Sequence, residues 1–333
     1  MHISALVWLI TIVVMVAVLV VDAVRLSRHP HVPSIRECLI AVGVFVGLAV
    51  LFGVAMHFWA GPAYSGEFFA GWLTEYSLSM DNLFIFLIIM TKLNVPKKAQ
   101  QFALLVGIML ALLFRGIFIG LGAALISRLA WIFFLFGAWL IYTAFGLVRD
   151  FVTGDSSEEE EAGDSRLVRW LKKIIPSTGD YRSDKLFVRE NGKLLATSLF
   201  FVVVALGTTD VMFALDSIPA IYGLTQEPYI VFTANVFALM GLRQLYFLLG
   251  GMLKKLVYLP IGLSVLLTFI GVKLVAHAMH HYGWDAALGF NFEISTGVSL
   301  LVIVGILLVT AIASVIQMLH ARRSSPTAGP PSA

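Results

Sequence analysis

Four acidic residues lie within long apolar stretches of this sequence, as two pairs with the same spacing. Glu75 and Asp81 form one pair, Asp210 and Asp216 form the other, and five residues separate the acids in each pair. An ionised aspartate at the centre of a membrane helix costs about 2.5–3.5 kcal/mol on insertion scales, so acids found there generally have a function or a partner. Carboxylate oxygens are hard ligands and suit Mg²⁺, Ca²⁺ or Mn²⁺ better than soft metals. The two pairs therefore predict a divalent-cation site inside a membrane protein.

The residues that follow the two pairs repeat as well. A small polar residue comes directly after each second acid, Asn82 in one copy and Ser217 in the other. In the next apolar segment, residues 107–115 match residues 235–243, and each of these stretches ends in an arginine. The recurrence predicts two copies of one structural unit, each contributing part of the site.

The spacing also restricts how the acids can meet a ligand. Positions six apart lie about 120° from each other on a regular helix, whereas Glu75, Ser79 and Asn82 share one face. Both acids of a pair can contact one cation only if the helix is locally unwound or if the site lies between helices. In the second copy, the glycine and two threonines that end at Thr209, together with Pro219, favour unwinding, because proline cannot donate to a helix carbonyl. Freed carbonyls often bind cations in transporters.

The elements that must position these residues are membrane helices. Of the 333 residues, 59% are hydrophobic and 13% are charged, compared with about a quarter charged in soluble domains. Continuous apolar runs predict helices rather than a β-barrel, and a spanning helix needs about 20 such residues. A net charge of +3 does not suggest nucleic acid, and a single cysteine offers neither an internal disulfide nor a soft-metal site. The predicted spans are residues 5–24, 38–59, 68–90, 102–125, 131–148, 195–214, 230–250, 257–277 and 294–319.

The distribution of basic residues predicts how these helices are oriented. Of the 23 Lys and Arg residues, 19 lie at the inner end of the first span and in every second connection after it, which places the N-terminus outside and the C-terminus in the cytoplasm. The third and sixth helices then run in opposite directions. The sequence thus predicts an inverted repeat of helices three to five and six to eight, as in many secondary transporters.

The chain divides into five predicted segments. Residues 1–60 form two peripheral spans, 61–148 the first repeat, 149–194 a cytoplasmic connection, 195–280 the second repeat, and 281–333 the last span with a disordered tail. The connection contains an acidic run at residues 158–161, a basic helix at 166–173 expected on the inner leaflet, and a hairpin at 187–194.

Some polar residues admit a structural interpretation. Arg115 and Arg243 could neutralise two of the four acids as buried ion pairs, and we expect at least one such pair. His277 and His281 have ligand spacing and predict a weak external metal site, although an interfacial polar cluster is the favoured alternative. The supporting residues expected around the cation are Ser79, Thr209, Asn235, Arg115 and Arg243.

Three stretches resemble the TerC family of bacterial membrane proteins, and the resemblance covers nearly the whole chain. They are Glu-Tyr-Ser-Leu-Ser-Met-Asp-Asn at residues 75–82, the run from Asp210 to Pro219, and residues 233–243. The resemblance implies Mn²⁺ efflux, a location in the bacterial inner membrane, and a relation to LysE-type exporters. Many members carry an acid three residues before the position of Asp210, where this chain has Gly207. The residues that the resemblance places near the ion path are Glu75, Asp81, Asn82, Asp210, Asp216 and Ser217.

These observations favour a secondary transporter that exports divalent cations, Mn²⁺ above others, with proton antiport as one way to drive it. The expected partners are the cation, protons and the bilayer, with no resident cofactor and no nucleic acid. A non-transporting component of a tellurite- or stress-resistance complex is the main alternative. An intramembrane aspartyl protease is disfavoured because Asp81 and Asp210 lack the Tyr-Asp and Gly-x-Gly-Asp contexts. We therefore predict that the protein is not an enzyme.

Overall fold

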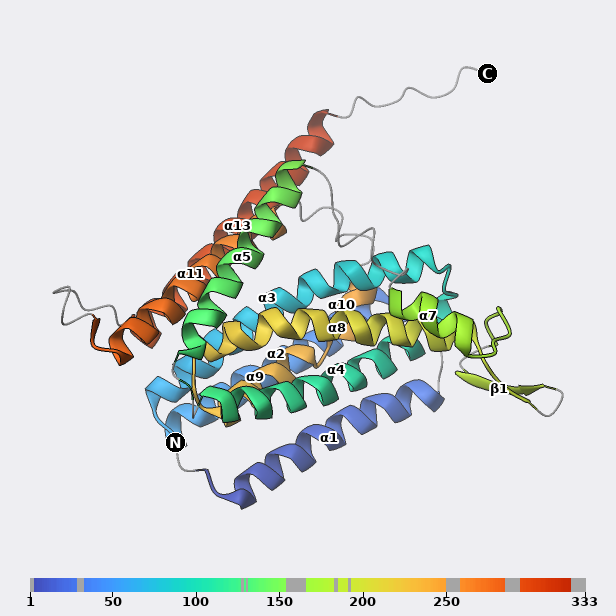
Figure 1. The fold of residues 1–333 in the computed structure, drawn as a ribbon, viewed down its shortest axis with the longest axis horizontal. Coiled ribbons are helices and arrows are strands. Elements are labelled where there is room, and N and C mark those ends of the chain that lie inside the picture. The colour runs from blue at the N-terminus through green and yellow to red at the C-terminus, as the bar shows by residue number, and fades with distance from the viewer. Residues whose placement is uncertain are drawn as a thin grey trace.

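The computed structural model describes residues 3–28, 33–126, 129, 131–153, 166–182, 185–190, 193–249, 258–284 and 294–324. These residues form helices and one small hairpin (Figure 1). The helices are α1 Ala5–Arg28, α2 Ile35–Trp59, α3 Pro62–Lys92, α4 Lys97–Ile126, α5 Ile132–Thr153, α7 Arg166–Ile174, α8 Ser198–Tyr222, α9 Pro228–Leu239, α10 Leu242–Leu249, α11 Leu259–His281 and α13 Thr296–Ser324. The strands are β1 Phe187–Glu190 and β2 Lys193–Ala196.

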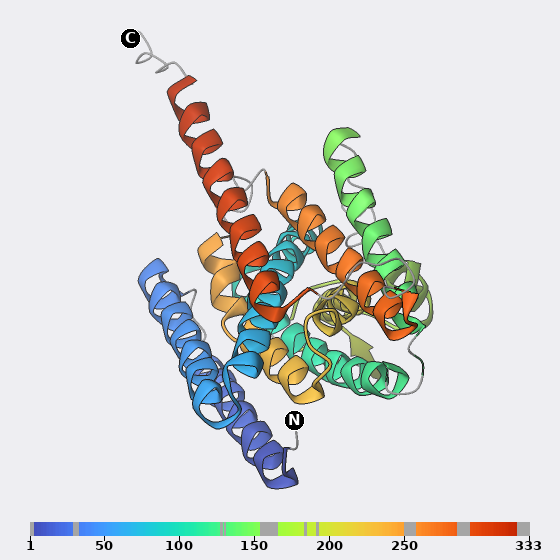
Figure 2. The ribbon, with the colours of Figure 1, turned by 90° about the vertical axis from the view of Figure 1, so that its left-hand side faces the viewer.

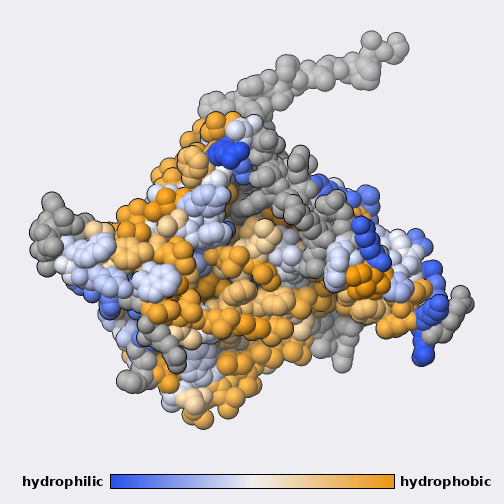
Figure 3. Space-filling model, viewed as in Figure 1, coloured by the Kyte–Doolittle hydropathy of each residue, from blue (hydrophilic) through white to orange (hydrophobic). Residues whose placement is uncertain are grey.

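Most of these helices have the length and composition of membrane spans. Eight segments of the described chain qualify, namely α2, α3, α4, α5, α8, α9 together with α10, α11 and α13, and α1 adds a shorter apolar stretch, Ala5–Val18. Figure 3 shows hydrophobic surface across the middle of the molecule and hydrophilic surface beside the hairpin. The prediction of an all-α polytopic membrane protein is confirmed.

The packing of the helices follows the predicted repeat. α3 packs against α9, α4 packs against α8, and α5 packs against α11. If α3–α5 and the run from α8 to α11 are copies of one unit, α3 corresponds to α8, α4 to α9 with α10, and α5 to α11. Exchanging the two copies then turns the α3–α9 contact into the α8–α4 contact and leaves the α5–α11 contact unchanged. The two helices that begin the copies, α3 and α8, run in opposite directions (Figure 1). This arrangement is the one expected of an inverted repeat.

The helices form two groups, which we name the bundle (α1–α4 and α8–α10) and the arm (α5, α11 and α13). Figure 1 shows the arm helices inclined to those of the bundle, and Figure 2 shows α1 and α2 along the edge of the bundle away from α5. The apolar core of the arm includes Ala70 and Leu78 from α3, with Ala220 and Leu224 from the end of α8. The two groups are therefore joined at the end opposite the hairpin and towards the middle.

Within the arm, α5 and α11 cross closely at two glycines. A Cβ atom at Gly137 would lie 2.7 Å from the carbonyl oxygen of Gly271, and one at Gly271 would lie 2.9 Å from the carbonyl oxygen of Gly137. Real Cβ atoms do not approach a backbone oxygen so closely, so both positions require glycine. The crossing therefore depends on the absence of side chains and holds the two helices together.

The prediction of unwinding before Asp210 is wrong. α8 is a continuous helix that includes Pro219, and the hydroxyls of Thr208 and Thr209 donate to the carbonyls four residues back within it, at 2.8 and 2.9 Å. The hydroxyls thus find partners without unwinding, and α8 packs along α4 as a continuous helix. The break lies instead in the next span, between α9 and α10, where Gly241 has a φ of +83°. That conformation costs an L-residue about 1–2 kcal/mol, so glycine marks the break.

The central connection has the two elements predicted for it. The basic helix is α7, whose Val168 is buried against the bundle core, and the hairpin pairs β1 with β2 in antiparallel register from Phe187 and Ala196 to Glu190 and Lys193. The hydroxyl of Tyr181 donates to the Leu93 carbonyl at 2.6 Å, which fastens the connection to the end of α3. The acidic run at residues 158–161 and the tail from residue 325 lie outside the described residues.

Candidate functional site

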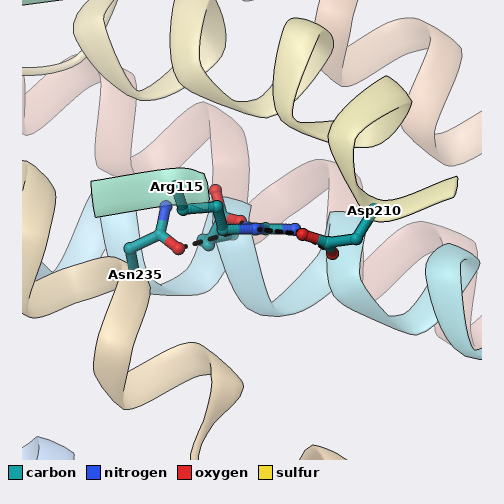
Figure 4. Close-up of polar contacts among 4 residues, drawn as sticks. Arg115, Asp210 and Asn235 are labelled. Carbon is teal, nitrogen blue, oxygen red and sulfur yellow. Dashed lines mark hydrogen bonds and ion pairs between the residues drawn. The ribbon is translucent and has the colours of Figure 1, made fainter. Parts of the chain in front are cut away.

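Arg115 on α4 lies at the centre of a buried polar network that joins the two repeats (Figure 4). Its Nη1 forms an ion pair with Glu75 of α3 and donates to Asn235 Oδ1 of α9 at 3.2 Å. Its Nη2 and Nε donate to the two carboxylate oxygens of Asp210 on α8, at 3.3 and 3.5 Å. The prediction of at least one buried arginine–acid pair is confirmed, and one guanidinium serves both repeats.

The network is almost completely shielded from solvent. Arg115 is 1% exposed, Glu75 0% and Asp210 2%. With its amide turned so that both ends are satisfied, Asn82 accepts from Arg115 Nη2 at 3.2 Å and donates to the Leu78 carbonyl at 3.0 Å. Glu75 and Asp210 share this one arginine, so carboxyl groups outnumber basic groups in the network and it stays attractive to cations.

Arg243, the counterpart of Arg115 in the second repeat, takes a different position. It follows the break at Gly241 and lines a mostly apolar cavity of about 210 Å³ with residues of α1, α2 and α4. The two repeats therefore differ in how their charged residues pair. In the described structure Glu75 and Asp210 both contact Arg115, instead of one acid contacting each arginine.

Asp216 lies apart from the arginine network, at the boundary between bundle and arm. Its Oδ1 accepts two hydrogen bonds from α5, one from Trp139 Nε1 at 2.7 Å and one from Thr143 Oγ1 at 3.1 Å. These two donors were not among the residues predicted from the sequence. They lie four residues apart and so share one face of α5, and that spacing is the signal that could have indicated them.

A small cavity of about 30 Å³ lies beside Asp216, where α3, α5, α8 and α11 meet. Oxygen-bearing side chains of three helices line it, from Asn82, Thr143, Asp216 and Ser217. The Ser217 hydroxyl is buried and has no hydrogen-bond partner among the described residues. Since about 10–15 Å³ is enough for one water molecule, the cavity can hold a water molecule or a bare metal ion. An unsatisfied hydroxyl beside a carboxylate suits a cation.

The other predicted ligands are placed less directly. Asp81 precedes Asn82 in α3, but its side chain lies outside the described part of the structure. Ser79 is buried with its hydroxyl unpartnered among the described residues, whereas the Thr209 hydroxyl bonds within α8 and faces no other predicted ligand. Across the described side chains, which exclude that of Asp81, no three His, Cys, Asp or Glu residues gather as a metal cluster. A cation at the cavity would therefore rely on neutral oxygens, such as those of Asn82 and Ser217, beside the Asp216 carboxylate.

A second polar cavity, of about 390 Å³, lies at the end where bundle and arm are joined. His277 lines it, and its Nε2 lies 2.7 Å from Gln226 Nε2. His281 is exposed and stacks edge-on against Tyr282. The two histidines thus have different neighbours, Gln226 for His277 and Tyr282 for His281.

Glu67 on α3 also lines this cavity and was missed by sequence analysis. Its Oε2 accepts a hydrogen bond from Thr225 Oγ1 at 2.5 Å, and Lys273 of α11 lines the same cavity. Glu67 lies one residue before the predicted third span, which begins at residue 68. In fact α3 begins five residues earlier, at Pro62.

The chain is similar to several known membrane proteins. The profile of the integral membrane protein TerC family matches residues 60–322. An uncharacterized membrane protein of Mycobacterium tuberculosis is 45% identical over 320 residues, covering 93% of this chain and 79% of the relative. One from Myxococcus xanthus is 37% identical over 317 residues, covering 95% and 94%. An Escherichia coli protein named as a candidate membrane-bound redox modulator, Alx, is 36% identical over 291 residues, covering 85% and 89%. No solved structure matches.

Proposed function

The chain belongs to the TerC family of integral membrane proteins, and from this premise we propose that it is a secondary transporter that exports divalent cations, Mn²⁺ above others. The cavity beside Asp216 carries the proposal. It brings the Asp216 carboxylate, the Asn82 amide and the unpartnered Ser217 hydroxyl to one place, beside the Thr143 hydroxyl that donates to the carboxylate, and oxygen ligands of this kind bind Mg²⁺, Ca²⁺ and Mn²⁺. The preference for Mn²⁺ and the relation to LysE-type exporters rest on the resemblance alone.

The charges around the cavity support a cation as the substrate. Asn82 connects the cavity to the Arg115 network, in which two acids face one arginine. Asp216 adds a further acid, whose hydrogen-bond partners among the described residues, Trp139 and Thr143, are not basic. A divalent ion would offset this excess charge, and protons could replace the ion on the same carboxylate, which is how antiport would operate.

The architecture supports movement of the ion towards the outside. Under the positive-inside orientation, in the bacterial inner membrane, the end where arm and bundle are joined faces outwards and the hairpin end faces the cytoplasm. The cavity lies on the boundary between two helix groups that diverge towards the cytoplasm. Such a boundary suits loading from the cytoplasm, followed by movement of one group against the other.

The test is transport by the purified full-length protein in proteoliposomes. We expect Mn²⁺ flux that exceeds Mg²⁺ and Ca²⁺ flux and that responds to a pH gradient. Asp216→Asn removes the charge at nearly constant volume and is expected to reduce the flux to that of empty liposomes. Glu190→Gln changes a half-exposed acid of the hairpin and is the matched control with wild-type flux.

Equal flux for Asp216→Asn and wild type would reject the proposed site. A wild-type protein that moves none of the three cations would favour the non-transporting alternative, a membrane component of a stress-response complex. The name of the Escherichia coli relative suggests a role in redox modulation, but this sequence contains one cysteine, Cys38, and so no dithiol pair of its own.

A further inference from the structure

The two hydrogen bonds that Asp216 accepts from described residues both come from the other helix group. Asp216 belongs to α8 of the bundle, whereas Trp139 and Thr143 belong to α5 of the arm. The two donors are one helical turn apart, so they reach the carboxylate from one face of α5. An indole N–H can only donate, so Trp139 contributes nothing but this bond to the chemistry of the site.

The two donors act on the same carboxylate oxygen. Trp139 Nε1 and Thr143 Oγ1 both donate to Oδ1, at 2.7 and 3.1 Å. Oδ2 accepts no hydrogen bond from the residues that the structure describes, so it is the oxygen available to a cation in the adjoining cavity. With Oδ1 held by two donors, the carboxylate plane cannot turn freely. Carboxylate ligands held in this way bind metals about 10–100-fold more tightly than those without their outer partners.

We propose that Trp139 and Thr143 are positioning residues for Asp216, and that through them the position of the arm sets the cation affinity of the site. The inference rests on the proposed function, because it takes the cavity beside Asp216 as the cation site. The site is complete only while α5 lies against α8. A displacement of α5 by a few ångströms would break both bonds, because a hydrogen bond does not survive a donor–acceptor distance beyond about 3.5 Å.

The close crossing of α5 and α11 couples the movements of these two helices of the arm. Gly137 and Gly271 leave no space between the two helices, so α5 cannot leave α8 without taking α11 with it. Linkage then requires reciprocity: if arm docking raises cation affinity by some factor, cation binding favours the docked arm by the same factor. The ion and the arm thereby control each other through two hydrogen bonds.

Binding measurements on the full-length protein in detergent test the positioning role. Trp139→Phe keeps an aromatic ring but loses the N–H, and Thr143→Val keeps the shape but loses the O–H. We expect each to weaken Mn²⁺ binding, measured by titration calorimetry, by about 10-fold. Thr143→Ser restores the hydroxyl and is expected to recover most of the affinity. Trp131→Phe, at an exposed tryptophan preceding α5, is the matched control.

The results separate this inference from the proposed function. If wild-type protein binds no Mn²⁺, the proposed function fails. If it binds Mn²⁺ and Trp139→Phe and Thr143→Val bind it equally well, the positioning role is overturned while the proposed function stands. Equal weakening by Thr143→Ser and Thr143→Val would also overturn it, because that result indicates disturbed packing rather than a lost donor.

A second measurement tests the coupling to the arm. Fluorophores at Val152→Cys on α5 and Leu113→Cys on α4, both exposed positions, in a Cys38→Ser background would report the distance between arm and bundle. We expect saturating Mn²⁺ to shift the energy-transfer distribution of the labelled parent protein. The same label pair in a Trp139→Phe, Thr143→Val double variant is expected to show little shift. An identical shift in both proteins would overturn the coupling.

Discussion

Replacing Arg115 with methionine tests the interpretation of the central network most directly. The substitution keeps a long, flexible side chain on α4 but removes the guanidinium that faces Glu75, Asp210 and Asn235. Both acids are then left without their basic partner at positions that are 0% and 2% exposed. Arg115→Met therefore creates two uncompensated buried carboxylates in one step.

The expected loss of stability is large. Breaking a buried ion pair by removing one partner costs about 3–5 kcal/mol, against a total stability of about 5–15 kcal/mol for a typical domain. The triple variant Arg115→Met, Glu75→Gln, Asp210→Asn removes the acids' charges as well. Since neutral replacement of a whole buried ion pair is often tolerated, we expect this variant to recover most of the lost stability.

Reversible unfolding in mixed micelles, followed by circular dichroism, provides the free energies for wild type, Arg115→Met, the double variant Glu75→Gln, Asp210→Asn, and the triple variant. The double variant leaves an unpaired buried arginine and should also be destabilised. If Arg115→Met unfolds with the free energy of wild type, the ion pairs do not hold the repeats together. A triple variant as unstable as Arg115→Met would show that packing, rather than charge, explains the loss.

Three further predictions concern the backbone and the central connection. Gly271→Leu forces side-chain atoms against the carbonyl of Gly137 and should cost about 1–3 kcal/mol in the same unfolding assay. Gly241→Ala places a Cβ at a φ of +83° and should cost about 1–2 kcal/mol. Tyr181→Phe removes the bond to Leu93 and should speed proteolysis of the connection. Burial raises the pKa of Tyr181, so in wild type the docking persists at neutral pH and is lost only as the pH rises beyond about 10.

Each of these three has a control and a contrary result. Gly305→Ala changes a helical glycine with open space around it, and it should be nearly neutral in the unfolding assay. If Gly271→Leu is as stable as Gly305→Ala, the close crossing of α5 and α11 is contradicted. If Gly241→Ala has the unfolding free energy of wild type, the expected strain at the break between α9 and α10 is contradicted. Unchanged proteolysis of Tyr181→Phe would show that the hydroxyl does not fasten the connection.

The sequence predicted features that depend on local pattern and composition. Apolar runs indicated the spans, the recurring acids indicated the repeat, and the hairpin followed from its turn residues. Partner choice depends on contacts between distant segments, so Arg115 was expected to meet an acid, but its sharing between Glu75 and Asp210 could not be foreseen. Trp139 and Thr143 were missed for the same reason, since Asp216 lies more than 70 residues further along the chain.

The helix break shows where local signals mislead. Pro219 and the threonines before Asp210 are common where helices unwind, yet α8 is continuous, its threonine hydroxyls bond to its own carbonyls, and it packs along α4. Proline near the last turn of α8 disturbs little that follows it. The glycine that breaks a span, Gly241, lies between two apolar residues in a continuous run, where composition alone gives no sign of a positive φ.

The sharing of Arg115 has a consequence for how the protein is made. Glu75 and Arg115 lie on consecutive helices, so they can enter the bilayer together as a hairpin in which these two residues are already paired. Asp210 is synthesised 95 residues after Arg115 and then meets a guanidinium that is already in the membrane. Expressed as separate fragments, the first half is expected to insert and persist without the second. The second half brings a buried acid whose partner it does not encode, so it is expected to be degraded unless the first half is supplied with it.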